Sequence, residues 1–125
     1  MTGRTYLSVS DILVLHTMLI EKFGGEPGLL SLAALESAIA RPHSGYYNDL
    51  VEEACALFQS LWTNHAFLDG NKRVAFAALS VFLQINGYRF KASSSNPFQE
   101  FLMWQERSAE FKVLVDLLKE SVEAR

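Results

Sequence analysis

The chain has 125 residues, of which 50% are hydrophobic and 20% are charged, and its formal net charge at pH 7 is −3. This length and composition are typical of one globular domain and exclude a disordered chain, so we expect a single domain over residues 1–125. The negative net charge argues against a general nucleic-acid binder, because such a protein needs a basic surface to release counterions. We therefore expect no direct nucleic-acid partner.

The single cysteine and the hydropathy pattern indicate the cellular context. Cys55 has no second cysteine with which to form an internal disulfide, which fits a reducing compartment. Because it lies in an apolar helical stretch without adjacent positive charge, we interpret it as a buried small hydrophobic residue. No signal-peptide pattern follows Met1, and polar residues interrupt every apolar run before it reaches the length of a membrane span. The sequence thus predicts a cytoplasmic protein with no membrane partner.

Capping signals and helical spacing predict two helices in the first third of the chain. The first is expected to begin at Asp11 behind a Ser10 N-cap and to end at Gly24-Gly25. The second is expected to begin after a Ser31 N-cap and to end before Pro42. Apolar residues spaced for inward helix faces are Ile12, Leu15, Leu19 and Phe23 in the first helix and Ala34, Leu35, Ala38 and Ile39 in the second.

Two further helices are predicted to form the centre of the molecule. After a polar loop over residues 42–50, a helix is expected from Val51, and its apolar stripe places His65 at its C-terminal end, facing inward. A helix over about residues 71–86 is apolar nearly all round, which is typical of a helix surrounded by others. Gly87 is expected to follow that helix as a left-handed cap.

The last third of the chain predicts a short extended segment followed by two helices. Tyr88-Arg89-Phe90 alternates briefly, and Asn96, Pro97 and Gln99 form an N-terminal helix signal. Ser108 is expected to begin the final helix, whose inward residues would be Phe111, Leu114, Val115 and Leu118. The predicted fold class is all-α, with about six helices arranged around the central apolar helix.

The segment from His65 to Arg73, His-Ala-Phe-Leu-Asp-Gly-Asn-Lys-Arg, has the parts of a phosphate-binding site. It leads into the start of a predicted helix, where the backbone N–H groups of residues 70–73 lack helical partners and the helix dipole favours an anion. Gly70 lets a phosphate oxygen approach the backbone closely. Lys72 and Arg73 add positive charge, and arginine can hold a phosphate with two hydrogen bonds.

Two further side chains of this segment suit phosphoryl transfer. Asp69 offers a hard oxygen ligand for the Mg²⁺ that accompanies a nucleotide polyphosphate. His65 can accept a proton from a hydroxyl nucleophile near neutral pH. Phe67 is expected to point into the core and to fix the shape of the loop. A base, a metal ligand and an anion-binding helix terminus are most of what phosphoryl transfer requires.

Each of these residues also has an ordinary structural interpretation. An inward histidine at a helix end is more often a core residue than a catalyst, and Asp-Gly-Asn is commonly a turn. Lys-Arg at a helix start is commonly solvated, but it is electrostatically unfavourable there without an anion. As one contiguous set, the residues favour a functional site. By contrast, we interpret His16 as a structural histidine and His43 as solvent-exposed.

The segment resembles the signature of the Fic/Doc family, in the variant His-x-Phe-x-Asp-Gly-Asn-Lys-Arg that is typical of death-on-curing (Doc) toxins of type II toxin–antitoxin systems. The N-terminal half is similar as well, through His16, Phe23-Gly24-Gly25, Pro27-Gly28-Leu29 and the run from Leu35 to Pro42. With Asn86-Gly87-Tyr88 included, the resemblance extends over about residues 6–90. It implies the Fic fold.

The resemblance implies a catalytic set of His65, Asp69, Lys72 and Arg73, with His65 as the base that deprotonates a target hydroxyl and Asp69 as the Mg²⁺ ligand. The phosphates of ATP would be bound by Gly70, Asn71, Lys72 and Arg73. Doc toxins are kinases that phosphorylate a threonine of translation elongation factor Tu. A short antitoxin blocks their site. The implied partners are therefore a cognate antitoxin and an elongation factor Tu-like protein substrate.

Three functions remain open from the sequence. The first is a toxin kinase that transfers the γ-phosphate of ATP to a protein hydroxyl. The second is a Fic-type AMP (nucleotidyl) transferase, which would use the same His65 at the α-phosphate, and the third is a non-catalytic binding module. Retention of His65, Asp69, Asn71 and Arg73 argues against the third. Lys72 favours the first, because family members that transfer AMP usually have glycine at that position.

Three features depart from the family's pattern or bear on the substrate. Ala66 replaces the family's frequent proline, and Thr63 and Ala77 fall where some Doc proteins have further polar or basic residues. Tyr46 and Tyr47 fall in the loop where the family's flap holds a target segment. Ordinary surface packing of these two tyrosines is an equal alternative.

Overall fold

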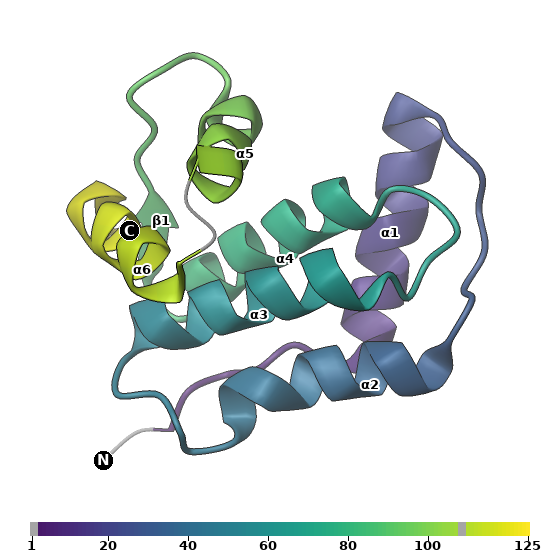
Figure 1. Ribbon diagram of the computed structural model, residues 1–125, viewed down its shortest axis with the longest axis horizontal. Helices are drawn as coiled ribbons and strands as arrows, with labels where there is room; N and C mark the ends of the chain where they lie inside the picture. Colours follow the sequence, from purple (N-terminus) through teal and green to yellow (C-terminus); the bar gives the residue numbers. More distant parts are fainter. Residues whose placement is uncertain (1–2, 108–109) are drawn as a thin grey trace.

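The computed structural model describes residues 3–107 and 110–125, which fold into a mostly helical bundle (Figure 1). The predicted all-α fold class is confirmed, with one small two-stranded sheet added. The predicted start of the last helix at Ser108 lies outside the described residues. In chain order the elements are α1 (Val9–Phe23), α2 (Leu32–Ala40), the 3-10 helix η1 (Arg41–His43), α3 (Leu50–Asn64), α4 (Asn71–Ile85), β1 (Tyr88–Phe90), α5 (Pro97–Arg107), α6 (Phe111–Ser121) and β2 (Val122–Ala124).

The helices α3 and α4 lie side by side at the centre of the bundle (Figure 1). α2 packs along α3, α1 crosses one end of the pair, α6 packs toward the other end, and α5 lies beside α4 with Phe98 near Arg73 in its first turn. The central position predicted for α4 is confirmed by its buried residues, and α3 is buried as extensively over residues 53–58. The loop between these two helices therefore joins the two most extensively buried helices of the described chain. The buried residues of α4 are Val74, Ala75, Ala78, Leu79, Phe82 and Leu83.

A capping box fixes the start of α1 two residues earlier than predicted. Ser8 Oγ accepts a hydrogen bond from Asp11 N (3.1 Å), and the Asp11 carboxylate accepts one from Ser8 N (2.8 Å). Ser8 is therefore the N-cap in place of Ser10, and the helix begins at Val9. The reciprocal pair satisfies two backbone donors, whereas Ser10 lies inside the first turn.

The other helix starts follow local capping signals closely. The N-caps predicted at Ser31 and Asn96 are confirmed, because each side chain accepts a hydrogen bond from the backbone N–H three residues later (3.0 and 3.1 Å). α3 begins at Leu50, one residue earlier than predicted, behind an Asp49 N-cap. These caps place the helices without help from distant contacts.

The extended segment predicted at residues 88–90 is confirmed as β1, and it pairs with a strand that the sequence did not predict. In the antiparallel pair, Tyr88 lies opposite Ala124 and Phe90 lies opposite Val122. β2 directly follows α6, and beyond it Arg125 N donates a hydrogen bond to Gly87 O (2.9 Å). The end of the chain thus closes the end of the bundle that lies away from the His65–Arg73 segment.

Cys55 is fully buried in α3, as predicted. Burial raises the pKa of its thiol, so the sulfur stays protonated and contributes packing and no nucleophile. Within the two described ranges, no helix is both long and apolar enough to cross a membrane.

Candidate functional site

His65 is the C-cap of α3, and its side chain is exposed, in contrast to the inward orientation that the apolar stripe predicted. Its backbone is left-handed (φ 48°, ψ 51°), and in the described part of the chain no other residue except glycine has a positive φ. This conformation ends the helical periodicity and turns the imidazole away from the α3 stripe. A non-glycine residue held there costs about 1–3 kcal/mol and is often found where function requires it.

Three side chains beneath the loop fix its shape. Phe67 is buried, as predicted, and its ring stacks on the imidazole of His16 from α1, with centroids 3.8 Å apart. Asn71 closes the loop, because its Nδ2 donates to Phe67 O (2.9 Å) and its Oδ1 accepts from Phe67 N (3.1 Å). The Asn71 side chain is thus used inside the loop, and its contribution to binding an anion would be its backbone N–H.

The first turn of α4 presents backbone donors without a competing cap. Its N-cap is Gly70 in the left-handed conformation (φ 77°), and among the described residues no side chain caps this helix. The first helical hydrogen bond runs from Val74 N to Gly70 O (3.0 Å), so the N–H groups of residues 71–73 have no partner within the helix. With the helix dipole, these donors form an anion-binding terminus.

Asp69 is held in place by contacts on three sides. Its Oδ1 accepts a hydrogen bond from Gly70 N (2.8 Å), and its Oδ2 accepts one from Glu26 N (3.2 Å). Its backbone carbonyl accepts a third from His16 Nε2 (2.7 Å). A β-carbon at Gly25 would lie 2.8 Å from Asp69 Oδ2, so the chain after α1 can approach this carboxylate only through a glycine.

The carboxylate of Asp69 fits a Mg²⁺ ion bound together with a nucleotide. Asp69 is exposed and lies directly before the open N-terminus of α4. Mg²⁺ commonly binds one or two carboxylates and takes its other ligands from substrate phosphates and water. The described residues contain no group of three or more His, Cys, Asp or Glu side chains that could hold a metal. A metal at this position would therefore depend on phosphate ligands.

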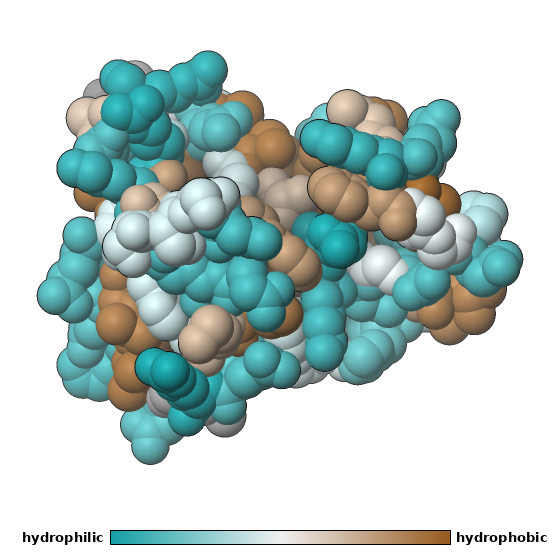
Figure 2. Space-filling view, turned by 90° about the horizontal axis from the view of Figure 1, so that it is seen from above, coloured by the Kyte–Doolittle hydropathy of each residue, from teal (hydrophilic) through white to brown (hydrophobic). Residues whose placement is uncertain are grey.

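All the residues predicted for the site line one cavity of about 420 Å³. Its other walls come from the end of α1 and from α5, and the view from above shows a hollow between the two sides of the molecule that carry these helices (Figure 2). Hydrophobic residues are exposed along this hollow (Figure 2). The structure thus brings the predicted residues together beside an apolar wall. The predicted residues are His65, Asp69, Gly70, Asn71, Lys72 and Arg73, and the remaining lining residues are Leu19, Ile20, Gly24, Leu68, Phe98 and Leu102.

The two cations of this cavity lack acidic partners. In the described part of the chain neither Lys72 nor Arg73 forms an ion pair. Lys72 Nζ lies 5.1 Å from the centroid of the Trp62 ring, and the Arg73 guanidinium lies 4.2 Å from the Phe23 ring and 5.0 Å from the Phe98 ring. Phe23 was predicted to face inward, but it is 50% exposed, and its ring lies against Arg73.

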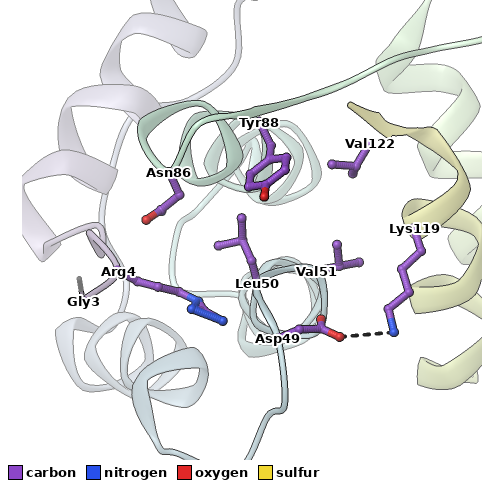
Figure 3. A pocket seen from close by; sticks show the side chains of 9 residues that line it. All are labelled: Gly3, Arg4, Asp49, Leu50, Val51, Asn86, Tyr88, Lys119 and Val122. Carbon is purple, nitrogen blue, oxygen red and sulfur yellow. Dashed lines mark ion pairs between the residues drawn. The ribbon is translucent and has the colours of Figure 1, made fainter. Parts of the chain in front are cut away.

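A second cavity, of about 480 Å³, lies at the other end of the central helices and differs in its charge (Figure 3). Its Lys119 Nζ pairs with Asp49 Oδ2 (3.2 Å), and its Arg4 Nε pairs with Glu53 Oε1 (2.8 Å). Both cations of that cavity are therefore neutralised within the protein. In the cavity at residues 65–73, by contrast, the positive charges of Lys72 and Arg73 can bind a ligand.

The segment that lies beside the loop is residues 28–31, and the sequence did not predict this. Leu29 forms an antiparallel bridge with Phe67, and Ala66 O accepts hydrogen bonds from the N–H groups of residues 30 and 31 (2.7 and 3.1 Å). Tyr46 and Tyr47 instead precede α3, whereas His65 follows it. These tyrosines line a different cavity, together with Arg41 and Phe111, and His65 is not among the residues that line it. Of the two alternatives for these tyrosines, the structure favours surface packing, since the Tyr47 hydroxyl accepts a hydrogen bond from Arg41 Nε (2.6 Å).

The two other histidines have structural surroundings. His16 is buried between Phe67 and the Asp69 carbonyl, as described above. His43 is exposed, as predicted, and its ring stacks on Tyr6 with centroids 4.1 Å apart. Of the three histidines, His65 alone lines the cavity with Lys72 and Arg73.

Comparisons with known proteins identify the family of the chain. The sequence model of the Fic/DOC family matches residues 6–83, which is well over half of the chain and includes the His65–Arg73 segment. The chain is 40% identical over 103 residues to Toxin Doc of Mycolicibacterium smegmatis, covering 78% of this chain and 77% of that protein. It is 29% identical over 86 residues to Protein kinase doc of Escherichia phage P1, covering 66% of this chain and 68% of that protein. The chain belongs to the Fic/Doc family.

Proposed function

We propose that this protein is a Doc-type toxin kinase, which transfers the γ-phosphate of ATP to a Ser or Thr hydroxyl of a protein. The observation that supports this most strongly is that His65 lines the same cavity as the N-terminus of α4 and as Lys72 and Arg73, which form no ion pair among the described residues. A base and an anion-binding terminus thus lie within one cavity. The names Toxin Doc and Protein kinase doc of the two relatives point to the same activity.

In this proposal the phosphates of ATP bind at the start of α4. The backbone N–H groups of residues 71–73 donate to phosphate oxygens, and the left-handed conformation of Gly70 turns the chain into that helix terminus. Arg73 can donate two hydrogen bonds to one phosphate. Mg²⁺ held by Asp69 would offset negative charge on the phosphates and orient them. Positioning and charge compensation of this kind supply most of the catalysis in phosphoryl transfer.

His65 takes the role of general base. The target hydroxyl oxygen attacks the γ-phosphorus, its proton passes to an imidazole nitrogen of His65, and the bond from the γ-phosphorus to the β–γ bridging oxygen breaks. The products are the phosphorylated side chain and ADP. Because His65 is exposed at the cavity, a side chain of another protein can reach it without opening the fold.

Lys72 supports transfer of the γ-phosphate over transfer of AMP. Its stem and charge occupy the second position of α4, where a glycine would leave the helix terminus open to the inner phosphates. With lysine there, we expect ATP to bind in another orientation and to present its γ-phosphate to the hydroxyl. The site would otherwise be the same, so positioning alone would select the reaction.

The proposed partners are an elongation factor Tu-like substrate, whose modification would stop translation, and a cognate antitoxin. We expect a segment of the antitoxin to fold onto an apolar groove of the bundle. The structure offers such a groove of about 290 Å³ between α1 and residues 27–29, with Phe67 and His16 at its floor. Val14 and Met18 on α1 are apolar and more than half exposed. Bound there, the antitoxin would contact the underside of the loop.

Growth of cells that express the protein without an antitoxin tests this proposal. We expect arrest with the wild type and normal growth with His65→Ala at equal protein levels. His43→Ala is the matched control, because it removes an exposed histidine away from the cavity, and it should arrest growth like the wild type. Harmless wild-type protein would refute the toxin function, and a toxic His65→Ala variant would refute the role of His65.

A further inference from the structure

Arg73 is enclosed by two aromatic rings that come from different helices. Its guanidinium carbon lies 4.2 Å from the centroid of Phe23, the last residue of α1, and 5.0 Å from that of Phe98, the second residue of α5. Three helices thus meet at this side chain. No carboxylate of the described residues pairs with Arg73, so its hydrogen-bonding edge is not taken up by an acidic partner.

This arrangement restrains a long side chain without using its donors. An arginine at a helix start ordinarily samples many rotamers, and fixing them on ligand binding costs entropy. Stacking on an aromatic face uses the plane of the guanidinium and leaves the N–H groups at its edge for an oxygen ligand. Phe23 and Phe98 therefore limit the rotamers of Arg73 before any ligand arrives.

Phe23 is more exposed than packing of its ring against the core would leave it. Its side chain is 50% exposed at the end of α1, where an inward orientation would have buried it. In that outward position its ring meets the Arg73 guanidinium at 4.2 Å and Lys22 Nζ at 5.3 Å. Phe98 is half-buried and also meets the ring of Phe76, so it links Arg73 to the aromatic cluster of α4, α5 and β1.

We propose that Phe23 and Phe98 are positioning residues, which hold the guanidinium of Arg73 oriented for phosphate. The inference rests on the proposed function. It assigns a role to α5, which lies beyond the residues 6–83 matched by the family model. The C-terminal part of the chain then completes the phosphate site.

Binding of ATP with Mg²⁺, measured by calorimetry on the full chain, tests this role. A cation–π contact at a partly exposed site contributes about 0.5–1 kcal/mol, so Phe98→Leu and Phe23→Leu should each weaken ATP binding about two- to fivefold. Phe98→Tyr keeps an aromatic face and should bind ATP like the wild type. In an Arg73→Gln background, which lacks the cation, Phe98→Leu should cause no further loss.

A matched control separates positioning from general stability. Phe90 belongs to the same aromatic cluster through Phe76, Phe101 and Trp104 but does not contact Arg73. Phe90→Leu should lower the melting temperature as Phe98→Leu does, and leave ATP affinity unchanged. Phe23→Leu changes an exposed helix end, so it keeps the test valid even if Phe98→Leu fails to fold.

The outcomes distinguish this inference from the proposed function. If wild-type protein binds no ATP, the proposed function fails and the positioning role fails with it. If the wild type binds ATP and the leucine variants bind it equally well, the positioning role is refuted and the function stands. The positioning role would also be refuted if Phe98→Leu weakened ATP binding as much in the Arg73→Gln background as in the wild type. A weaker ATP affinity of Phe90→Leu would refute it as well.

Discussion

His16 Nε2 donates a hydrogen bond to the backbone carbonyl of Asp69 across 2.7 Å, which links α1 to the loop that carries the proposed base and metal ligand. The nitrogen must carry a hydrogen, because a carbonyl oxygen only accepts. The same imidazole stacks on Phe67. One buried side chain therefore fixes the carbonyl of Asp69 and the ring that anchors the loop.

Substitution of His16 should lower activity by displacing Asp69. His16→Phe keeps a ring to stack on Phe67 but leaves the Asp69 carbonyl without its donor, which we expect to cost about 1–3 kcal/mol of unfolding free energy. Activity should fall, and a higher Mg²⁺ concentration should be needed for half-maximal activity, because the carboxylate would lose its fixed position. Denaturant unfolding and Mg²⁺ titrations of activity measure both effects. Unchanged Mg²⁺ dependence would show that His16 does not position Asp69.

The left-handed backbone of His65 predicts a separation of stability from activity. His65→Ala and His65→Gly should both lower phosphoryl transfer about 10²–10⁴-fold, as expected for loss of a general base. Glycine adopts a positive φ without strain, so His65→Gly should be more stable than His65→Ala by about 1 kcal/mol. Chemical denaturation measures the difference. If the alanine variant were the more stable one, the backbone there would not be left-handed in solution.

Gly70 has a positive φ and also lies at the anion site. Gly87 has a positive φ but lies away from the site, so a comparison of the two separates backbone strain from ATP binding. Gly70→Ala should cost about 1 kcal/mol of stability and also weaken ATP binding, because relief of its left-handed strain would move the backbone donors of the helix terminus; the β-carbon itself would face Ile20 and His16 Nε2 at 3.4 and 3.5 Å. Gly87→Ala has a similar backbone strain (φ 92°) with open space around its β-carbon, far from the loop. It should lose comparable stability and bind ATP normally. Equal ATP affinity in both variants would contradict the anion site at Gly70.

Lys72→Gly tests which phosphate the site selects. We expect it to weaken γ-phosphate transfer severely, because it removes the charge and stem that orient ATP. Lys112→Gly is the matched control, because Lys112 is also the second residue of its helix and lies in α6, away from the site. Both variants should lose similar helix stability, about 1 kcal/mol. Rates of transfer that fall equally in the two would show that Lys72 acts only through stability.

Local signals in the sequence were sufficient for most of the fold. The N-caps at Ser31 and Asn96 and the apolar pattern of residues 71–86 each depend on neighbouring residues, and the structure confirms them. The start of α1 was misplaced because Ser8 and Ser10 are both good caps. Only the reciprocal bond with Asp11 separates them.

The parts that could not be predicted depend on distant contacts or on one backbone angle. The outward direction of His65 follows from a positive φ, which helical periodicity does not reveal. The pairing of Leu29 with Phe67 joins segments that are far apart in the chain, and no local pattern indicates such a pairing. The sequence therefore draws attention to Tyr46 and Tyr47, whereas residues 28–31 lie beside the loop. β2 is a three-residue strand directly after a helix, and it forms only because it pairs with the distant strand β1.

Labelling with ATP tests the central claim most directly. Purified protein, incubated with Mg²⁺ and a cell extract, should transfer label to a protein from ATP labelled at the γ-phosphate and not from ATP labelled at the α-phosphate. His65→Ala should transfer neither, whereas His43→Ala should behave like the wild type. Label that appears only from the α-phosphate would contradict the kinase and support AMP transfer. Absence of label from both positions, in an extract that contains elongation factor Tu, would contradict a catalytic function for the cavity at His65.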